Sequence, residues 1–190
     1  MSNTSSHQLT ITSGTFRGRK LIAPVVSTTH PMGSREKMAL FNSLTSLIGP
    51  LESVENVLDC YCGSGALGLE ALSRGAKRAV FVDNNVSALQ ATKDNIATLG
   101  LSDRSEVIKS SIEDIASTSV SWQKYDLILA DPPYDHFPAS LAQLANLLKD
   151  QGILALSHPT SVSPAKICPN LTLLSTKSYA SANLSFFQKM

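Results

Sequence analysis

The sequence lacks the long apolar runs that would place it in a membrane. No stretch of its 190 residues approaches the ~20 consecutive apolar residues that a membrane span needs, and the polar opening MSNTSSHQLT has no signal-peptide core. There are three cysteines, and Cys60-x-Cys62 lacks the CxxC spacing typical of metal and redox sites. We therefore expect reduced thiols in a cytoplasmic protein, with no metal and no membrane contact.

Net charge is also nearly absent. The chain carries 16 basic and 15 acidic residues, and the resulting charge of +1 indicates no class of partner by itself. The distribution is less even, because residues 1–37 hold five basic residues against one acidic residue, for +4, and the remainder holds 11 against 14, for −3. A basic opening segment fits either a contact with nucleic acid or a solvated hairpin, and charge alone does not decide between them.

Length and composition fit one domain with a small appendage. Of the residues, 43% are hydrophobic and 16% charged, which is enough for a sizeable core. Residues 1–50 are predicted as an N-terminal extension. Within it, β-prone runs at 8–12 and 19–23 flank the turn SGTFRG and predict a hairpin, and a helix is predicted to begin at Ser34 and to end near Gly49.

The pattern over residues 51–190 is that of an α/β domain. Apolar runs suited to buried parallel strands alternate with helical patterns. The predicted strands are 56–61, 78–83, 105–110, 125–130 and 152–157, and the predicted helices are 66–74, 86–99 and 138–149. Two β-prone runs around residues 180–182 close the chain as an antiparallel hairpin on one sheet edge. The whole predicts a doubly wound, Rossmann-like domain.

A glycine-rich segment, DCYCGSGALG, follows the first of these strands. Its three glycines, Gly63, Gly65 and Gly68, form a GxGxxG pattern between a strand and a helix, which permits a tight turn and a close backbone approach to a nucleotide. Asp83 ends the next strand, where a carboxylate binds ribose hydroxyls in either S-adenosylmethionine or NAD enzymes. Asp59 is suited to the methionine ammonium group, directly or through water, and therefore favours S-adenosylmethionine.

Other side chains beside these loops complete the predicted cofactor site. After the third strand, Ser111 is placed to hydrogen-bond the adenine edge and Ile112 to pack on the adenine face, although Ser111 fits a plain turn residue equally well. We also assign three residues of the first two loops to this site, namely Tyr61, Ser64 and Asn84.

The segment DPPY at 131–134 directly follows the apolar strand DLILA. Carboxyl ends of strands are where open α/β sheets bind ligands, and the two prolines, Pro132 and Pro133, keep the segment extended. The Asp131 carboxylate and the Pro132 carbonyl then form a rigid pair of acceptors beside the flat ring of Tyr134. This arrangement fits a planar substrate with an exocyclic amine, whose hydrogens would bond to both acceptors while Tyr134 stacks on the ring. The predicted chemistry is methyl transfer to that nitrogen.

Four segments together resemble a known family, the bacterial 16S ribosomal RNA guanine-N2 methyltransferases. The segments are GTFRGRKLIAP (14–24), HPMGSREKMALFNSL (30–44), DCYCGSGALGLEALSRGA (59–76) and DLILADPPY (126–134). The resemblance covers most of the chain from residue 9 onward. This sequence departs from the family pattern at Met38, at Ser110 and Ser111, at Ser157-His158 and at Ser181.

The resemblance implies a class I S-adenosylmethionine-dependent methyltransferase with a seven-stranded, mostly parallel sheet. It also implies a guanine-N2 target in 16S rRNA of the 30S subunit. We expect the protein to be a monomer. Five basic side chains would then contact RNA, with Arg35 and Lys37 as possible cofactor contacts as well: Arg17, Arg19, Lys20, Arg35 and Lys37.

Several other readings compete with this one. DNA adenine-N6 and cytosine-N4 methyltransferases share the DPPY motif, but commonly carry a large recognition domain for which 190 residues leave no space. A non-catalytic, cofactor-binding RNA assembly factor would be expected to lose Asp131 or the glycines. Protein glutamine methylation favours an Asn at this position, and nothing resembles the acid or base of a hydride-transfer enzyme. Surface positions are the expectation for His136 and His158.

Overall fold

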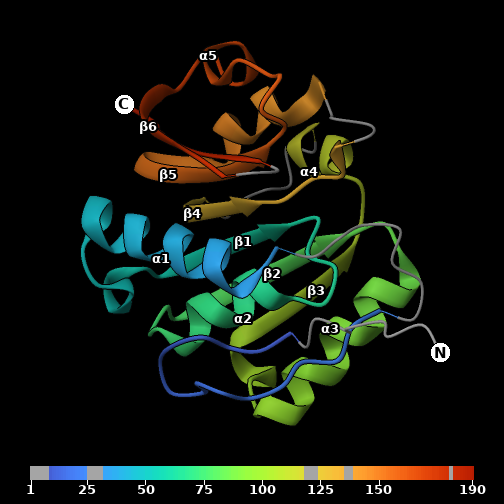
Figure 1. The fold of residues 1–190 in the computed structure, drawn as a ribbon. Helices are drawn as coiled ribbons and strands as arrows, with labels where there is room; N and C mark the ends of the chain where they lie inside the picture. The colour runs from blue at the N-terminus through green and yellow to red at the C-terminus, as the bar shows by residue number, and fades with distance from the viewer. Residues whose placement is uncertain (1–8, 25–31, 118–123, 135–138, 180–181) are drawn as a thin grey trace, which may run out of the picture.

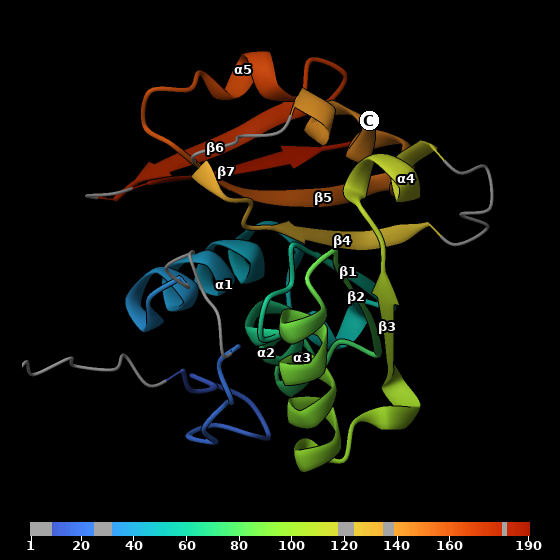
Figure 2. The ribbon, with the colours of Figure 1, turned by 90° about the vertical axis from the view of Figure 1, so that its right-hand side faces the viewer.

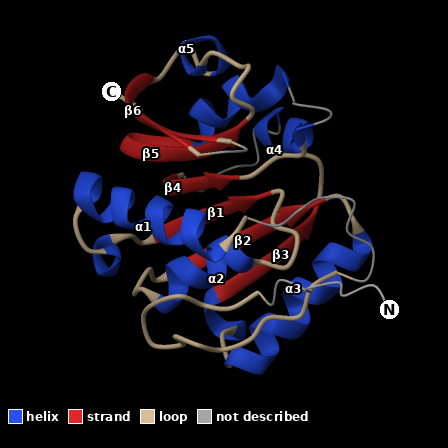
Figure 3. Ribbon diagram, viewed as in Figure 1, coloured by secondary structure: helices blue, strands red, loops and turns tan. Residues whose placement is uncertain are grey.

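The computed structural model describes residues 9–24, 32–117, 124–134, 139–179 and 182–190, and these ranges form a seven-stranded sheet. The strand order is β3-β2-β1-β4-β5-β7-β6, and Figure 3 shows the strands as one continuous layer. The first five strands are parallel, and β7 is antiparallel to both β5 and β6. Their bounds are β1 Asn56–Cys60, β2 Arg78–Asp83, β3 Ser105–Lys109, β4 Tyr125–Ala130, β5 Leu148–His158, β6 Thr172–Ser178 and β7 Asn183–Gln188. The predicted fold class is confirmed.

Helices cover both faces of this sheet. Figures 1 and 2 show α1, α2 and α3 on one face and α4 and α5 on the other. Apolar residues of α1, α2 and α3 share one core with the extension, and those of α4, α5 and the 3-10 helix η4 share the second core. The bounds are α1 Ser34–Ile48, α2 Ala66–Ser73, α3 Val86–Leu99, α4 Ile112–Ser117, α5 Pro164–Ile167 and η4 Ala139–Leu147, with short 3-10 turns η1 at Leu51–Ser53 and η2 at Ser102–Arg104. Within the described ranges, no helix combines the length and apolar character needed to cross a membrane.

The helix predicted over 138–149 is wrong in type and in its end. Residues 139–147 form a 3-10 helix, and residue 138 lies outside the described residues. The strand β5 already begins at Leu148, which pairs with Tyr125 before the register shifts. Gln151 stands at this irregularity with a φ of 64°. Strand pairing therefore takes the last predicted helical residues into the sheet.

The N-terminal hairpin has the predicted turn but hardly any strand. Its arms are joined by one isolated antiparallel bridge, Thr10 with Lys20. The Ile11 amide donates to the Arg19 carbonyl at 3.0 Å. The segment instead packs against α2, where the Thr15 amide donates to the Ser73 carbonyl at 2.8 Å. These contacts with α2 replace the ladder that a longer hairpin would form.

A buried carboxylate fixes this packing. Glu70 of α2 has no solvent exposure, and its Oε1 accepts hydrogen bonds from Arg74 Nε at 2.8 Å and Thr12 Oγ1 at 2.7 Å. Its Oε2 accepts from the Thr12 amide at 2.8 Å and pairs with Lys37 Nζ at 3.1 Å. Both oxygens are thus satisfied, as a buried charge requires. The cluster ties the extension, α1 and α2 together.

Candidate functional site

The glycine-rich loop connects β1 to α2 through three residues with positive φ. Tyr61 and Gly63 both have φ near 57°, and Gly65 has φ 77°. A positive φ is uncommon for a bulky residue such as Tyr61, and such backbone strain clusters at functional sites. A Cβ on Gly68 would lie 2.4 Å from the Phe81 ring, whereas one on Gly63 would meet no atom within 4 Å. The loop is therefore tightly packed on its inner side and open at Gly63.

Asp59 supports this loop from below. Its side chain is 1% exposed, and Oδ2 accepts a hydrogen bond from the Gly68 amide at 2.8 Å. Burial raises the pKa of Asp59 well above its ordinary value, and the nearby Asp131 and Asp83 carboxylates raise it further. One oxygen is thus committed to shaping the first turn of α2. The contact of Asp59 with a methionine ammonium group stays a prediction.

Asp83 holds the opposite side of the loop. Its Oδ2 accepts from the Gly63 amide at 2.9 Å, and Oδ1 accepts from the Asn85 amide at 2.9 Å. Asn85 in turn caps α3, because its side chain accepts from the amides of Ser87 and Ala88. Asp83 therefore stands at the carboxyl end of β2, where the sequence places it.

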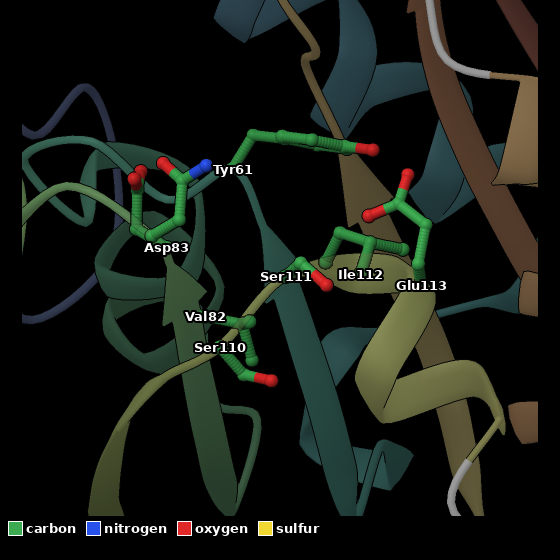
Figure 4. A pocket seen from close by; sticks show the side chains of 8 residues that line it. Tyr61, Val82, Asp83, Ser110, Ser111, Ile112 and Glu113 are labelled. Carbon is green, nitrogen blue, oxygen red and sulfur yellow. The ribbon is translucent and has the colours of Figure 1, made fainter.

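A hollow opens between these strand ends. Figure 4 shows Tyr61 extending above Ser111 and Ile112, and Asp83 lies at the left of the same view. Of the predicted cofactor residues, it brings together Tyr61, Asp83, Asn84, Ser111 and Ile112. Three more lining residues were not predicted from the sequence: Val82, Ser110 and Glu113.

The two interpretations of Ser111 are compatible. Ser111 lines the hollow and also behaves as a turn residue, because its Oγ accepts from the Asp114 amide at 3.0 Å at the start of α4. Ile112 is 2% exposed and belongs to the second core, so it forms an apolar floor. A flat ring could therefore rest on Ile112 beside a hydroxyl.

Two buried polar residues of α3 hold the glycine loop and were missed from the sequence. Thr92 Oγ1 donates to the Gly63 carbonyl at 2.8 Å, and Asn95 Nδ2 donates to the Ser64 carbonyl at 2.9 Å. Ser64 itself is 5% exposed, and its contact with α3 is made by its backbone carbonyl. The three-residue spacing of Thr92 and Asn95 places both among the apolar residues on the buried face of α3. Because buried polar side chains need hydrogen-bond partners, this spacing was the sequence signal that could have identified them.

The DPPY segment lies at the carboxyl end of β4, next to the end of β1. Asp131 directly follows Ala130, which pairs with Cys60. Asp131 is half-buried, Pro132 is buried, and Pro133 and Tyr134 are half-buried. The carboxylates of Asp59, Asp83 and Asp131 thus come from three neighbouring strands, in the order β2-β1-β4.

Burial raises the pKa of Asp131 to about 6, a hydrogen bond from Ser157 lowers it, and the nearby Glu36 carboxylate raises it. Burial also raises the pKa of Tyr134 to about 12. The Tyr134 hydroxyl is hydrogen-bonded to the Ser157 hydroxyl. Asp131 is therefore a carboxylate that is ionised at neutral pH yet able to take up a proton readily.

The last two residues of β5, Ser157 and His158, differ from expectation. His158 is fully buried, not on the surface, and its Nε2 lies 2.9 Å from Ser185 Oγ. It is the last residue of β5 and pairs with Asn183 of β7. Ser157, whose hydroxyl is hydrogen-bonded to that of Tyr134, was not predicted as a site residue. His136 lies outside the described residues.

The predicted RNA-binding residues divide into two groups. Four of them have exposed side chains, which leaves them free to meet phosphates: Arg17, Arg19, Lys20 and Arg35. The prediction for Lys37 is wrong, because its side chain is 3% exposed, pairs with Glu70 and donates to the Thr10 carbonyl. A buried, paired ammonium is not available to RNA or to a cofactor.

Comparison with known proteins decides the family. A family model described as "Conserved hypothetical protein 95" matches residues 9–188. The chain belongs to this family. It is 34% identical to "Ribosomal RNA small subunit methyltransferase D" of Haemophilus influenzae, over 95% of this chain and 94% of that protein. The family predicted from the sequence is thereby confirmed.

Solved structures agree with this assignment. "Putative methyltransferase yhhF" of Escherichia coli superimposes with a TM-score of 0.80 at 26% identity, covering 96% of this chain and 98% of that one. A 16S rRNA N2 methyltransferase of T. thermophilus, solved in complex with AdoMet and guanosine, gives a TM-score of 0.69 at 20% identity. The superposition covers 88% of this chain and 45% of that protein. At this level of identity it supports the fold alone.

Proposed function

We propose that this protein is an S-adenosylmethionine-dependent methyltransferase that methylates the N2 amine of a guanine in small-subunit ribosomal RNA. The observation that carries the proposal is the position of Asp131. It is a partly buried carboxylate on a proline-stiffened segment, one strand away from the glycine loop. A methyl donor in the loop and an amine acceptor at Asp131 would then face each other across the ends of β1 and β4.

The residues of the hollow fit S-adenosylmethionine in their chemistry. Asp83 offers a carboxylate to ribose hydroxyls, and Ile112 offers an apolar surface to adenine. The open space before Gly63 is what close approach of a ligand requires. When bound, S-adenosylmethionine supplies an electrophilic methyl group on its sulfonium.

The chain's own part in the reaction is positioning and proton acceptance. The Asp131 carboxylate and the Pro132 carbonyl would accept the two hydrogens of the guanine amine, which directs the nitrogen lone pair out of the ring plane. Tyr134 would stack on the base and offset part of the cost of unstacking it. The methylated nitrogen is strongly acidic, so a carboxylate with a pKa of about 6 suffices to take its proton. Correct positioning alone contributes on the order of 7–11 kcal/mol in favourable cases.

The choice of ribosomal RNA rests on the relatives and on the basic segment. The Haemophilus relative is named for the small subunit, and its alignment spans nearly the whole of both chains. Three exposed cations on the N-terminal turn would contact RNA phosphates: Arg17, Arg19 and Lys20. A DNA amino-methyltransferase would use the same DPPY chemistry, and this is the second candidate that the experiment must distinguish.

The deciding experiment incubates the protein with isotopically labelled S-adenosylmethionine and one of three substrates: small ribosomal subunits, naked ribosomal RNA or DNA. The modified nucleoside is then identified by mass spectrometry. N2-methylguanosine from subunits or RNA supports the proposal, whereas N6-methyladenine or N4-methylcytosine from DNA refutes it. Asp131→Ala serves as the matched control, because it should abolish transfer while leaving cofactor affinity within a few-fold. Unchanged turnover in this variant would remove Asp131 from the mechanism.

A further inference from the structure

We infer that Asn95 of α3 is a positioning residue that makes cofactor binding depend on the N-terminal segment, residues 9–24. It does so by holding the backbone of Ile22 on one side and the backbone of Ser64 on the other. The inference rests on the proposed function and deepens it, because it ties the segment that would contact RNA to the loop that would hold S-adenosylmethionine.

The side-chain amide of Asn95 is hydrogen-bonded to two separate parts of the backbone. Its Oδ1 accepts from the Ile22 amide at 2.8 Å, and its Nδ2 donates to the Ile22 carbonyl at 3.0 Å. Nδ2 also donates to the Ser64 carbonyl at 2.9 Å. Both amide hydrogens are thereby used, and a rotated amide would place its oxygen against two carbonyls. One side chain, only 2% exposed, therefore joins the N-terminal segment to the glycine loop in one fixed orientation.

On the loop side, the hydrogen bond fixes the peptide group between Ser64 and Gly65. The carbonyl and the N–H of a trans peptide point in opposite directions, and the Gly65 amide donates to the Cys62 carbonyl at 2.7 Å. Holding the Ser64 carbonyl toward α3 therefore keeps the turn from Cys62 to Gly65 closed. Ser64 lies between two glycines with positive φ, so the loop has backbone freedom that this hydrogen bond restricts.

On the segment side, Ile22 is held through its backbone. Its side chain is 52% exposed, so packing contributes little. The preceding residue, Leu21, is buried in the first core, and its amide donates to the Leu9 carbonyl at 2.8 Å. Lys20, one of the exposed cations of the turn, lies two residues before Ile22. The stretch proposed to contact RNA phosphates therefore ends next to the Asn95 contact.

Thr92 shows what support of the loop looks like without the segment. It belongs to the same helix, and its Oγ1 donates to the Gly63 carbonyl at 2.8 Å. Its other hydrogen-bond partner is Cys62 Sγ at 3.6 Å, which also belongs to the loop. Asn95 differs from Thr92 because its amide reaches the N-terminal segment as well. The two residues thus form a matched pair for separating loop support from the link to the segment.

The deciding experiment removes the segment side of the contact and leaves the loop side in place. Ile22→Pro removes the backbone N–H that donates to Asn95. Ile22→Ala is the matched control, because it shortens the same exposed side chain and keeps both backbone hydrogen bonds. In calorimetry, Ile22→Pro should bind S-adenosylmethionine about threefold more weakly, the equivalent of one hydrogen bond, and Ile22→Ala should bind it as wild type does. Equal affinities in the two Ile22 variants would overturn the inference.

Hydrogen exchange tests the link without any ligand and without a substitution in the segment. Asn95→Ala should speed exchange of the Ile22 amide and of the Gly65 amide together, because both lose the side chain that holds them. Thr92→Val should speed exchange in the loop alone. An Ile22 amide that stays as protected in Asn95→Ala as in wild type would overturn the inference, even if Ile22→Pro fails to fold.

Kinetics separate cofactor positioning from a general loss of stability. In Asn95→Ala, KM for S-adenosylmethionine should rise by about tenfold, and kcat should stay within about twofold of wild type, because Asp131 is untouched. A lower kcat at constant KM would contradict a role in cofactor positioning. If the wild-type protein methylates no ribosomal RNA, the proposed function fails, while calorimetry and hydrogen exchange still decide whether Asn95 makes this link.

Discussion

Replacing Asp131 by Asn should make the protein more stable at neutral pH, although it removes the proposed catalytic group. The pKa of Asp131 is raised from 3.8 to about 6 by burial. The native state therefore binds a proton more tightly than the unfolded state does. Stability from this residue is fully present below pH 3.8 and is lost as the pH rises through about 6. At pH 7 the ionised carboxylate is thus a cost that Asn does not carry.

The magnitude follows from the same pKa values. Each pKa unit corresponds to about 1.4 kcal/mol, so the change from 3.8 to about 6 amounts to about 3 kcal/mol if fully realised. The side chain is only half-buried, and water screens part of this cost, so we expect about 2 kcal/mol.

Urea unfolding of both proteins from about pH 4 to about pH 8 measures this difference, since the range spans most of the titration. The free-energy gap between Asp131→Asn and wild type should open as the pH rises and level off above neutrality. Asp103→Asn, which replaces an exposed aspartate of the turn η2, is the control for the loss of one carboxylate. A gap that is independent of pH, or a less stable Asp131→Asn protein at pH 7, would refute the assignment of a raised pKa.

Three further predictions address other parts of the molecule. Gly68→Ala should weaken cofactor binding in calorimetry and lower the melting temperature, because its Cβ would stand 2.4 Å from Phe81; unaltered binding would contradict the packed inner side of the loop. Lys37→Met should destabilise the fold by about 3–5 kcal/mol in urea unfolding, because it removes one of the two cations that pair with the buried Glu70, and a neutral effect would show that Arg74 alone satisfies Glu70. Neutralising Arg17, Arg19 and Lys20 together should weaken RNA binding and reduce the slope of its salt dependence by about three units at most. An unaltered slope would mean that the turn is a solvated surface that does not contact RNA.

The sequence predicts well wherever the structure depends on local rules. The glycine pattern, the strand-end aspartates and the DPPY segment each combine a backbone constraint with a position at a strand end, so the sequence alone places them at one edge of the sheet. The bounds of α3 follow in the same way from a capping residue, Asn85, and a left-handed glycine, Gly100. These features require no knowledge of distant contacts.

Predictions fail where the deciding contact is distant along the chain. Lys37 looks like a surface cation until Glu70, 33 positions away, is placed beside it. Ser157 looks like a strand residue until Tyr134 turns its hydroxyl toward it. The early start of β5 depends on the pairing of Leu148 with Tyr125. No local pattern encodes these pairs, because each depends on how the two segments meet in three dimensions.

Helix α1 connects the exposed basic segment to the sheet edge that carries Asp131. Two adjacent residues of this helix act on different parts of the molecule. Lys37 donates to the Thr10 carbonyl and pairs with Glu70, which fixes the segment that carries the exposed cations. Glu36 acts electrostatically on Asp131 and raises its pKa. A shift of α1 would therefore move the exposed cations and change the electrostatic field at Asp131 together.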